Sequence, residues 1–130
     1  MGAVINAQEV ITPSISIAQA SRVTSTATGT AVDLTQVDSA LVLFNYGTIT
    51  DGTFTPSITS SATLGGSYTT DTDFSGTMTA GTSAADDTIV AVTYNGSKNF
   101  IKAVLTVSGS PGTGGFVSAT VIPFKNGYRP

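Results

Sequence analysis

Residues 39–46 read Ser-Ala-Leu-Val-Leu-Phe-Asn-Tyr, the most hydrophobic run of the chain, and Gly47 follows at once. The run has the length of a strand, contains β-branched and aromatic residues, and stops at a glycine. This pattern is typical of a strand buried in the middle of a sheet. We therefore expect a central strand at residues 39–46, and the rest of the chain is interpreted outward from it.

Other segments repeat the strand pattern with different strength. Residues 87–94, 100–107 and 116–124 are clear strands by the same criteria. Two weaker strands, at residues 10–17 and 53–59, contain Pro13 and Pro56. Proline has no N–H to donate to a ladder, so both are expected at sheet edges. The remaining expectations are a polar strand at 22–28, short strands at 67–70 and 77–79, and an otherwise irregular excursion over residues 60–86.

Turn signals separate these strands at intervals of about ten residues. Asn95-Gly96 lies between two apolar runs, which is the strongest short-range signal for a β-hairpin. We therefore predict Asn95 and Gly96 as the turn of a hairpin joining 87–94 to 100–107. Further turns are expected at 33–38 and 50–53, and a flexible loop is expected at 108–115.

Seven or eight short strands and no confident helix predict an all-β fold. We expect an antiparallel β-sandwich, for which a jelly roll is one topology and a small barrel the alternative. The predicted organisation is an extended N-terminal arm at residues 1–20, a β-sandwich domain at 21–124 and a C-terminal tail at 125–130.

Composition excludes several classes of protein. The 130 residues include no Cys and no His, so disulfides, zinc fingers and imidazole-based catalytic triads are excluded. Only 10% of residues are charged and the net charge is −3 with five Lys and Arg, which argues against nucleic-acid binding. Since no apolar run approaches 18 residues, no membrane-spanning helix is expected.

The acidic pairs are the first candidates for chemistry. Asp71 with Asp73 and Asp86 with Asp87 are the tight pairs of carboxylates. A glycosidase needs two carboxylates across a cleft, and calcium prefers hard oxygen ligands. Both pairs lie in polar stretches of a chain without Trp, and the later Gly and Glu of an EF-hand loop are missing. We interpret them as solvated loop acids, with calcium as the lesser alternative.

Three further motifs point to no catalysis. No Ser-x-x-Lys spacing precedes Lys98 or Lys102, and the glycine-rich residues 109–115 lack the lysine and the helix of a phosphate-binding loop. Asn95-Gly96-Ser97 matches a glycosylation sequon, but the turn interpretation already explains Asn-Gly. We therefore expect no catalytic, cofactor-binding or metal-binding residues and no enzymatic activity.

A low-charge, Thr-rich surface suits protein partners, because few ions must be desolvated in a contact. Lys98, Lys102, Lys125 and Arg129 are dispersed and could contact an acidic protein or protect an edge strand. The extended arm is the expected contact with a partner or a neighbouring copy. Its contact residues are predicted to be Val10, Ile11, Pro13, Ile15 and Ile17.

Several segments resemble a family of small β-rich head proteins of tailed bacteriophages, encoded near the major capsid protein. The resemblance runs over about residues 20–122. It rests on segments within residues 22–34, 38–42, 47–56, 94–104 and 106–115, of which Gly47-Thr-Ile-Thr-Asp-Gly-Thr-Phe-Thr-Pro56 is the most specific. Where family members often carry an acidic stretch after this proline, the present chain has Ser60-Ser-Ala-Thr63.

The resemblance implies a virion structural protein, a capsid decoration or cement protein that binds the outer capsid surface and stabilises the shell by bridging its subunits. The implied partners are the major capsid protein and copies of the chain itself. A homotrimer is expected from the symmetry of a capsid lattice. The implied location is the capsid surface of the virion, after synthesis in the host cytoplasm. The family offers no catalytic residues to carry over.

Two alternatives remain open. In the first alternative the protein is still a component of the virion, but it is a head–tail connector or a tail component rather than a protein of the capsid surface. A carbohydrate-binding or adhesin-like module would use Tyr46, Tyr68, Tyr94 and Tyr128 to stack on sugars.

Overall fold

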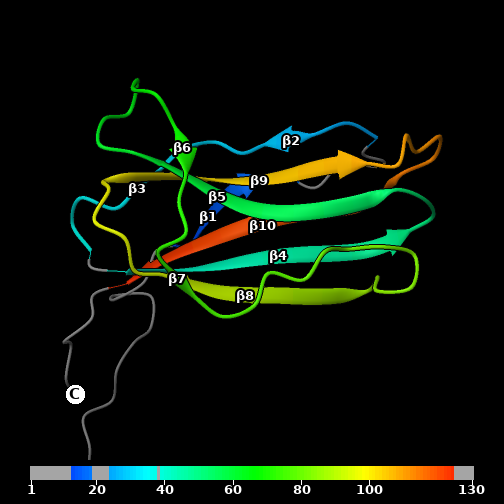
Figure 1. Cartoon of the computed structure of the whole chain (residues 1–130). Coiled ribbons are helices and arrows are strands. Elements are labelled where there is room, and N and C mark those ends of the chain that lie inside the picture. The colour runs from blue at the N-terminus through cyan, green and yellow to red at the C-terminus, as the bar shows by residue number, and fades with distance from the viewer. Residues whose placement is uncertain (1–12, 19–23, 38, 125–130) are drawn as a thin grey trace, which may run out of the picture.

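The computed structural model describes residues 13–18, 24–37 and 39–124. Two antiparallel five-stranded sheets face each other, so the predicted β-sandwich is confirmed (Figure 1). Sheet A has the order β1 (Ser14–Ile17), β10 (Gly115–Phe124), β4 (Ser39–Ile49), β8 (Thr88–Tyr94) and β7 (Phe74–Ser75). Sheet B has the order β2 (Ala27–Thr28), β9 (Phe100–Ser108), β5 (Thr53–Ser61) and β6 (Thr69–Thr70), and β3 (Val32–Asp33) also pairs with β9.

The most hydrophobic run occupies the predicted position. β4 is the middle strand of sheet A, paired with β10 on one side and β8 on the other. Because side chains alternate along a strand, Val42, Phe44 and Tyr46 point into the sandwich and are buried. The core that they join also includes Phe54, Ile58, Val92, Tyr94, Ile101, Leu105, Val117 and Val121.

The prediction of an edge strand at Pro56 is wrong, because β5 lies between β9 and β6 in sheet B, but the partners on the side away from β9 flank Pro56 rather than pair with it. The backbone N–H of Phe54 donates to Gly81 O at 2.9 Å, and Ile58 O accepts from the N–H of Asp71 at 2.8 Å, so these groups point away from β9. Backbone groups of a strand repeat their direction every second residue, so the nitrogen of Pro56 points away from β9, as the nitrogen of Phe54 does. The missing N–H of Pro56 therefore costs no hydrogen bond between β5 and β9. β6 pairs with β5 only at Thr59 and Ser60.

The prediction of an Asn95-Gly96 hairpin is wrong. β8 pairs with β4 and β7 in sheet A, whereas β9 pairs with β2, β3 and β5 in sheet B. Residues 95–99 therefore cross from one sheet to the other. The local reason for Gly96 is a close approach, because a Cβ there would lie 2.1 Å from the hydroxyl oxygen of the buried Tyr94.

The N-terminal boundary of the sandwich also differs from the prediction. β1 pairs with β10, and Ile17 is only 6% exposed within the core. The buried Ser16 hydroxyl donates to Thr30 O at 3.0 Å and accepts from the N–H of Ala103 in β9 at 3.1 Å. Residues 14–17 are thus an edge strand that links sheet A to sheet B rather than part of a separate arm. The rest of the predicted arm, residues 1–12 and 19–20, lies outside the described residues.

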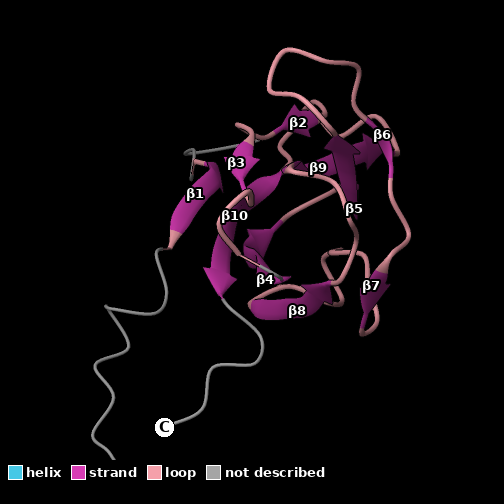
Figure 2. Cartoon of the chain, turned by 90° about the vertical axis from the view of Figure 1, so that its left-hand side faces the viewer, coloured by secondary structure: helices cyan, strands magenta, loops and turns pink. Residues whose placement is uncertain are grey.

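Residues 62–87 link the two sheets on the opposite side of the sandwich (Figure 2). The segment first adds β6 to β5, then adds β7 to β8, and Gly81 forms a bridge with Phe54. A short strand was correctly expected near 67–70, but residues 77–79 form none and β7 was not predicted. Met78 and Phe74 pack against the core, so the excursion contributes apolar contacts.

Candidate interaction surface

The outer face of sheet A presents apolar side chains to solvent. Alternation turns the even-numbered residues of β10 and the odd-numbered residues of β4 and β8 away from the core. Two of the outward residues are largely exposed, Ile15 at 67% and Ile89 at 64%. The half-buried or exposed apolar members of this face are Ile15, Leu41, Leu43, Ile89, Ala91, Phe116, Ile122 and Phe124.

Strand register arranges these side chains in rows across the sheet. Ile15, Thr120, Leu43 and Ala91 form one row across four strands. The neighbouring rows contain Ile122, Leu41 and Thr93, and Ser118, Asn45 and Ile89. The described side chains in these rows are all uncharged. We call the solvent-facing surface formed by these rows and by the apolar residues named above the outer A face.

Sheet B has a different outer face. β5 turns Thr and Ser outward, and β9 turns out Phe100, Lys102, Val104 and Thr106. The Lys102 ammonium lies 4.1 Å from the centre of the Tyr68 ring, which places a cation–π pair on this side. The outward side chains of β5 are Thr53, Thr55, Ser57 and Thr59. The two faces of the sandwich therefore differ in charge and in polarity.

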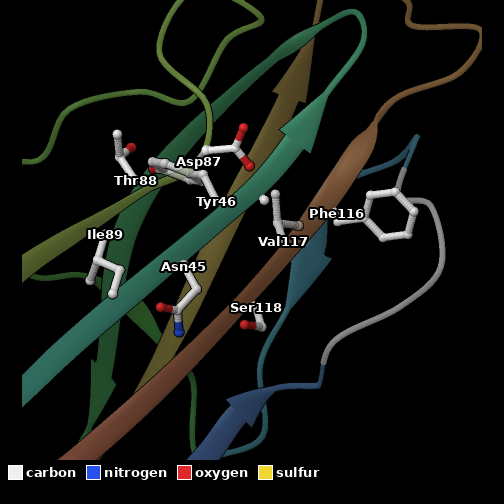
Figure 3. A pocket seen from close by; sticks show the side chains of 9 residues that line it. Asn45, Tyr46, Asp87, Thr88, Ile89, Phe116, Val117 and Ser118 are labelled. Atoms are coloured by element: carbon white, nitrogen blue, oxygen red, sulfur yellow. The ribbon is translucent and has the colours of Figure 1, made fainter.

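A shallow pocket of about 390 Å³ lies at one end of the outer A face. Figure 3 shows Asn45 of β4 and Ser118 of β10 close together, with Phe116 further along β10. Asp87 stands at the same end, directly before β8. This end of the face combines polar side chains with Ile89 and is its polar rim.

Asp87 at this rim and its neighbour Asp86 connect β4 to β8. Asp87 adopts a left-handed backbone conformation with φ of 51°, and its N–H donates to Gly47 O at 3.1 Å. The Asp86 carboxylate accepts from the N–H of Ile49 at 3.3 Å. Asp tolerates the left-handed region better than most residues, which accounts for its place here. Both acids thus fix the end of β4 against the start of β8.

Asp71 anchors the excursion to the sandwich. Its carboxylate accepts hydrogen bonds from the Ser60 hydroxyl at 2.7 Å, the Tyr94 hydroxyl at 2.8 Å and the N–H of Asp73 at 2.9 Å. Partial burial raises the pKa of Asp71, but these hydrogen bonds and the Lys98 charge outweigh it and lower the pKa below its ordinary value. The sequence predicted a loop acid here, and it did not indicate the partners.

The glycine-rich loop is occupied by another acid of the chain. The Asp51 carboxylate accepts from the N–H groups of Gly112 at 3.0 Å, Thr113 at 3.1 Å and Gly114. Successive backbone N–H groups form an anion-binding nest, and here the anion is the carboxylate of Asp51. The loop predicted at residues 108–115 is therefore pinned to the β4–β5 turn.

The three tyrosines in the described part of the chain do not form a sugar-stacking platform. Tyr46 and Tyr94 are 3% and 0% exposed, so their expected role in stacking on sugars is wrong. Burial raises the pKa of each phenol to about 12, and for Tyr94 the Asp71 carboxylate adds to the effect. The Tyr68 ring is already covered by Lys102 on one side. Tyr128 lies outside the described residues.

The predicted contact residues of the arm separate into three groups. Ile17 is in the core and is unavailable to a partner, which corrects its assignment. Pro13 and Ile15 are exposed, and Ile15 belongs to the outer A face. Val10 and Ile11 lie outside the described residues. The signal that sequence reasoning missed is that several outward positions of β4 and β10 are apolar, namely Leu41, Leu43, Phe116, Ile122 and Phe124.

Comparisons with protein families, with characterised proteins and with solved structures found no match to this chain. The described part of the chain holds no helix that is long and apolar enough to cross a membrane. Over the same residues, no group of three or more acidic, His or Cys side chains is placed to hold a metal ion.

Proposed function

We propose that this protein is a virion structural protein that decorates the outer surface of a tailed-phage capsid. The resemblance to small phage head proteins supports the proposal, and its segments adjoin in the structure. The most specific segment, residues 47–56, contains Asp51, and Gly114, which belongs to the matched pair Gly114-Gly115, donates its N–H to the Asp51 carboxylate. That contact joins two matched segments that are far apart in the chain, and it is the observation on which the proposal rests.

The surface chemistry agrees with a protein that works through protein contacts. The outer A face offers apolar side chains without charges that would need desolvation, as the core of a protein–protein interface does. Each contact on a capsid can be modest, since several linked sites gain avidity. A decoration protein of this kind bridges neighbouring capsid subunits and resists the outward pressure of packaged DNA.

The contact with the capsid, or with a neighbouring copy, is proposed for the N-terminal segment, including Val10, Ile11, Pro13 and Ile15. The structure changes how this is tested, because removing residues 2–19 would also remove β1. A truncation of residues 2–12 keeps β1 intact. We expect this variant to lose capsid binding; unchanged binding would refute the role of Val10 and Ile11.

The proposal is tested with phage heads that lack the protein. Purified chain is added to such heads and the bound chain per major capsid subunit is measured at saturation. We expect tens to hundreds of bound copies per head and slower loss of DNA on heating. Saturation at about a dozen copies or fewer would instead assign the protein to the head–tail connector or the tail. No binding to heads would refute a capsid role.

A further inference from the structure

We propose that Asn95 is a site of spontaneous covalent modification, at which reaction with the backbone of Gly96 converts the side-chain amide to a carboxylate. The sequence predicts a hairpin turn at this pair, whereas the structure places the pair where the chain crosses from sheet A to sheet B. Close packing against Tyr94 explains the glycine but not the asparagine before it. The inference concerns the chemistry of the isolated chain and does not depend on the proposed function.

The reaction is a ring closure between two neighbouring residues, which are held close by the chain itself. The backbone nitrogen of Gly96 attacks Cγ of Asn95 and loses its proton, while the Cγ–Nδ2 bond breaks and the nitrogen leaves as ammonia. Water then opens the cyclic imide. Attack of water at Cγ gives aspartate, and attack at the main-chain carbonyl gives isoaspartate, in which the chain continues through the side chain. Water is the only other reactant.

The backbone nitrogen of Gly96 is available for this attack. None of the described residues accepts a hydrogen bond from its N–H, since β8 ends at Tyr94 and β9 begins at Phe100. Glycine also restricts the backbone least and has no side chain to shield its nitrogen. The approach of this nitrogen to Cγ of Asn95 is therefore opposed neither by a sheet ladder nor by a side chain at position 96.

The side chain of Asn95 is exposed, so water can reach Cγ and ammonia can leave. Its Nδ2, the atom that leaves, donates to the Ser75 hydroxyl at 3.0 Å in an exposed contact. The other described asparagines lack this combination. Asn45 lies within β4, which is paired on both sides, and Asn99 is followed by the bulky Phe100. We therefore expect Asn95 to react before either of them.

Conversion would disturb the contacts around the buried phenol of Tyr94. The N–H of Asn95 donates to Asp73 O at 2.7 Å, and the Tyr94 hydroxyl donates to the Asp71 carboxylate at 2.8 Å. A carboxylate at position 95 adds a like charge beside these acids. Isoaspartate also lengthens the main chain by one carbon before Gly96, which is packed against the Tyr94 hydroxyl. We expect the modified chain to be less stable to heat.

The experiment stores the folded protein at neutral and at mildly alkaline pH and quantifies every asparagine by peptide mass spectrometry, which separates amide from carboxylate. An isoaspartyl methyltransferase assay measures isoaspartate. A synthetic peptide of residues 90–100 gives the reactivity of the pair outside the fold, and circular dichroism checks that the stored protein stays folded. Asn126-Gly127, a second such pair, lies outside the described residues and is quantified as a separate peptide.

The control variant is Asn95→Gln, which keeps the amide but places it one carbon further from the backbone, where ring closure is much slower. This variant should form no product at position 95 under the same storage. Its thermal unfolding before storage checks that it is folded.

We expect conversion at Asn95 to be at least about tenfold faster than at Asn45 and Asn99, and faster at alkaline pH because base removes the Gly96 proton. The fraction converted at Asn95 should melt at a lower temperature than the intact fraction. If Asn95 stays an amide in the folded protein, even where the peptide reacts, the inference is overturned. Equal melting of the two fractions would refute the effect on Tyr94. Capsid binding enters none of these measurements.

Discussion

At the scale of single residues, carboxylates act as anchors between segments. Asp71 ties Ser60 of β5 and Tyr94 of β8 to the excursion, and Asp51 ties the β4–β5 turn to the β9–β10 loop. Each carboxylate accepts several hydrogen bonds, and such charge-assisted bonds are stronger than neutral ones. Although the chain has few charged residues, Asp51 and Asp71 thus hold its loops against the strands.

The anchor at Asp71 makes stability depend on acid pH. Because the folded-state pKa of Asp71 is lowered, its contribution is present above the ordinary value of 3.8 and is lost as pH falls through the folded pKa. Asp71→Asn should be less stable than the unaltered protein at pH 7, and the two should converge in strong acid. Urea unfolding at a series of pH values measures this; parallel curves at every pH would contradict it.

A glycine at position 96 is required by the buried phenol beside it. Gly96→Ala would place a Cβ 2.1 Å from the Tyr94 hydroxyl oxygen and 2.3 Å from Cζ. Tyr94 is 0% exposed and bound to Asp71, so it has little freedom to move. We expect a loss of about 1–3 kcal/mol in the free energy of unfolding, as for overpacking of a core.

The matched control for Gly96 is Gly65. A Cβ at Gly65 meets nothing within 4 Å, so Gly65→Ala should change stability by less than about 0.5 kcal/mol. Equal stability of the two alanine variants in urea would contradict the role assigned to Tyr94.

At the scale of elements, short segments connect the two sheets at their sides. β1 pairs with β10 of sheet A while Ser16 bonds to Thr30 and to Ala103 of β9. On the other side, β6 and β7 lie on β5 and β8. The long strands form the layers, and these short ones connect the layers.

Ser16 tests the connection made by β1. Ser16→Ala leaves the buried N–H of Ala103 and the carbonyl of Thr30 without this partner, which should cost about 1–3 kcal/mol. Ser57→Ala, at an outward position of β5, is the control and should be nearly neutral. If denaturant unfolding shows no difference between the two, β1 does not join the sheets as described.

Sequence patterns predicted the long strands well and their partners poorly. β4, β5, β8, β9 and β10 were predicted because their hydrophobic runs are local properties of the chain. The Asn95-Gly96 hairpin failed because both flanking strands pair with distant strands, and Gly96 is used for a close approach to Tyr94. The outer A face was missed because a strand with both faces apolar looks like any buried strand.

At the scale of the whole molecule, a single core shared by both sheets should unfold as one unit. Tyr46 and Tyr94 are parts of that core, and burial raises the pKa of both phenols to about 12. A raised folded-state pKa gives stability that is fully present below pH 10 and lost as pH rises toward 12. Two of the four tyrosines should therefore ionise together with unfolding.

This alkaline transition is followed by phenolate absorbance and by circular dichroism in the same titration. Tyr94→Phe should remove one late-ionising phenol and also the bond to Asp71. Ionisation of Tyr46 and Tyr94 near pH 10 in a fully folded protein would contradict their burial.

The molecule as a whole offers one largely polar outer face, one uncharged outer face and the N-terminal strand β1 at the edge of sheet A. These features suit a protein that contacts other protein subunits in a large assembly, and we propose that this assembly is a phage capsid that the protein decorates. The most direct test is the number of copies per purified virion, measured by quantitative mass spectrometry against the major capsid protein. Capsid decoration predicts a simple ratio to the capsid subunit, equivalent to tens to hundreds of copies. A dozen copies or fewer, or absence from the particle, would contradict it.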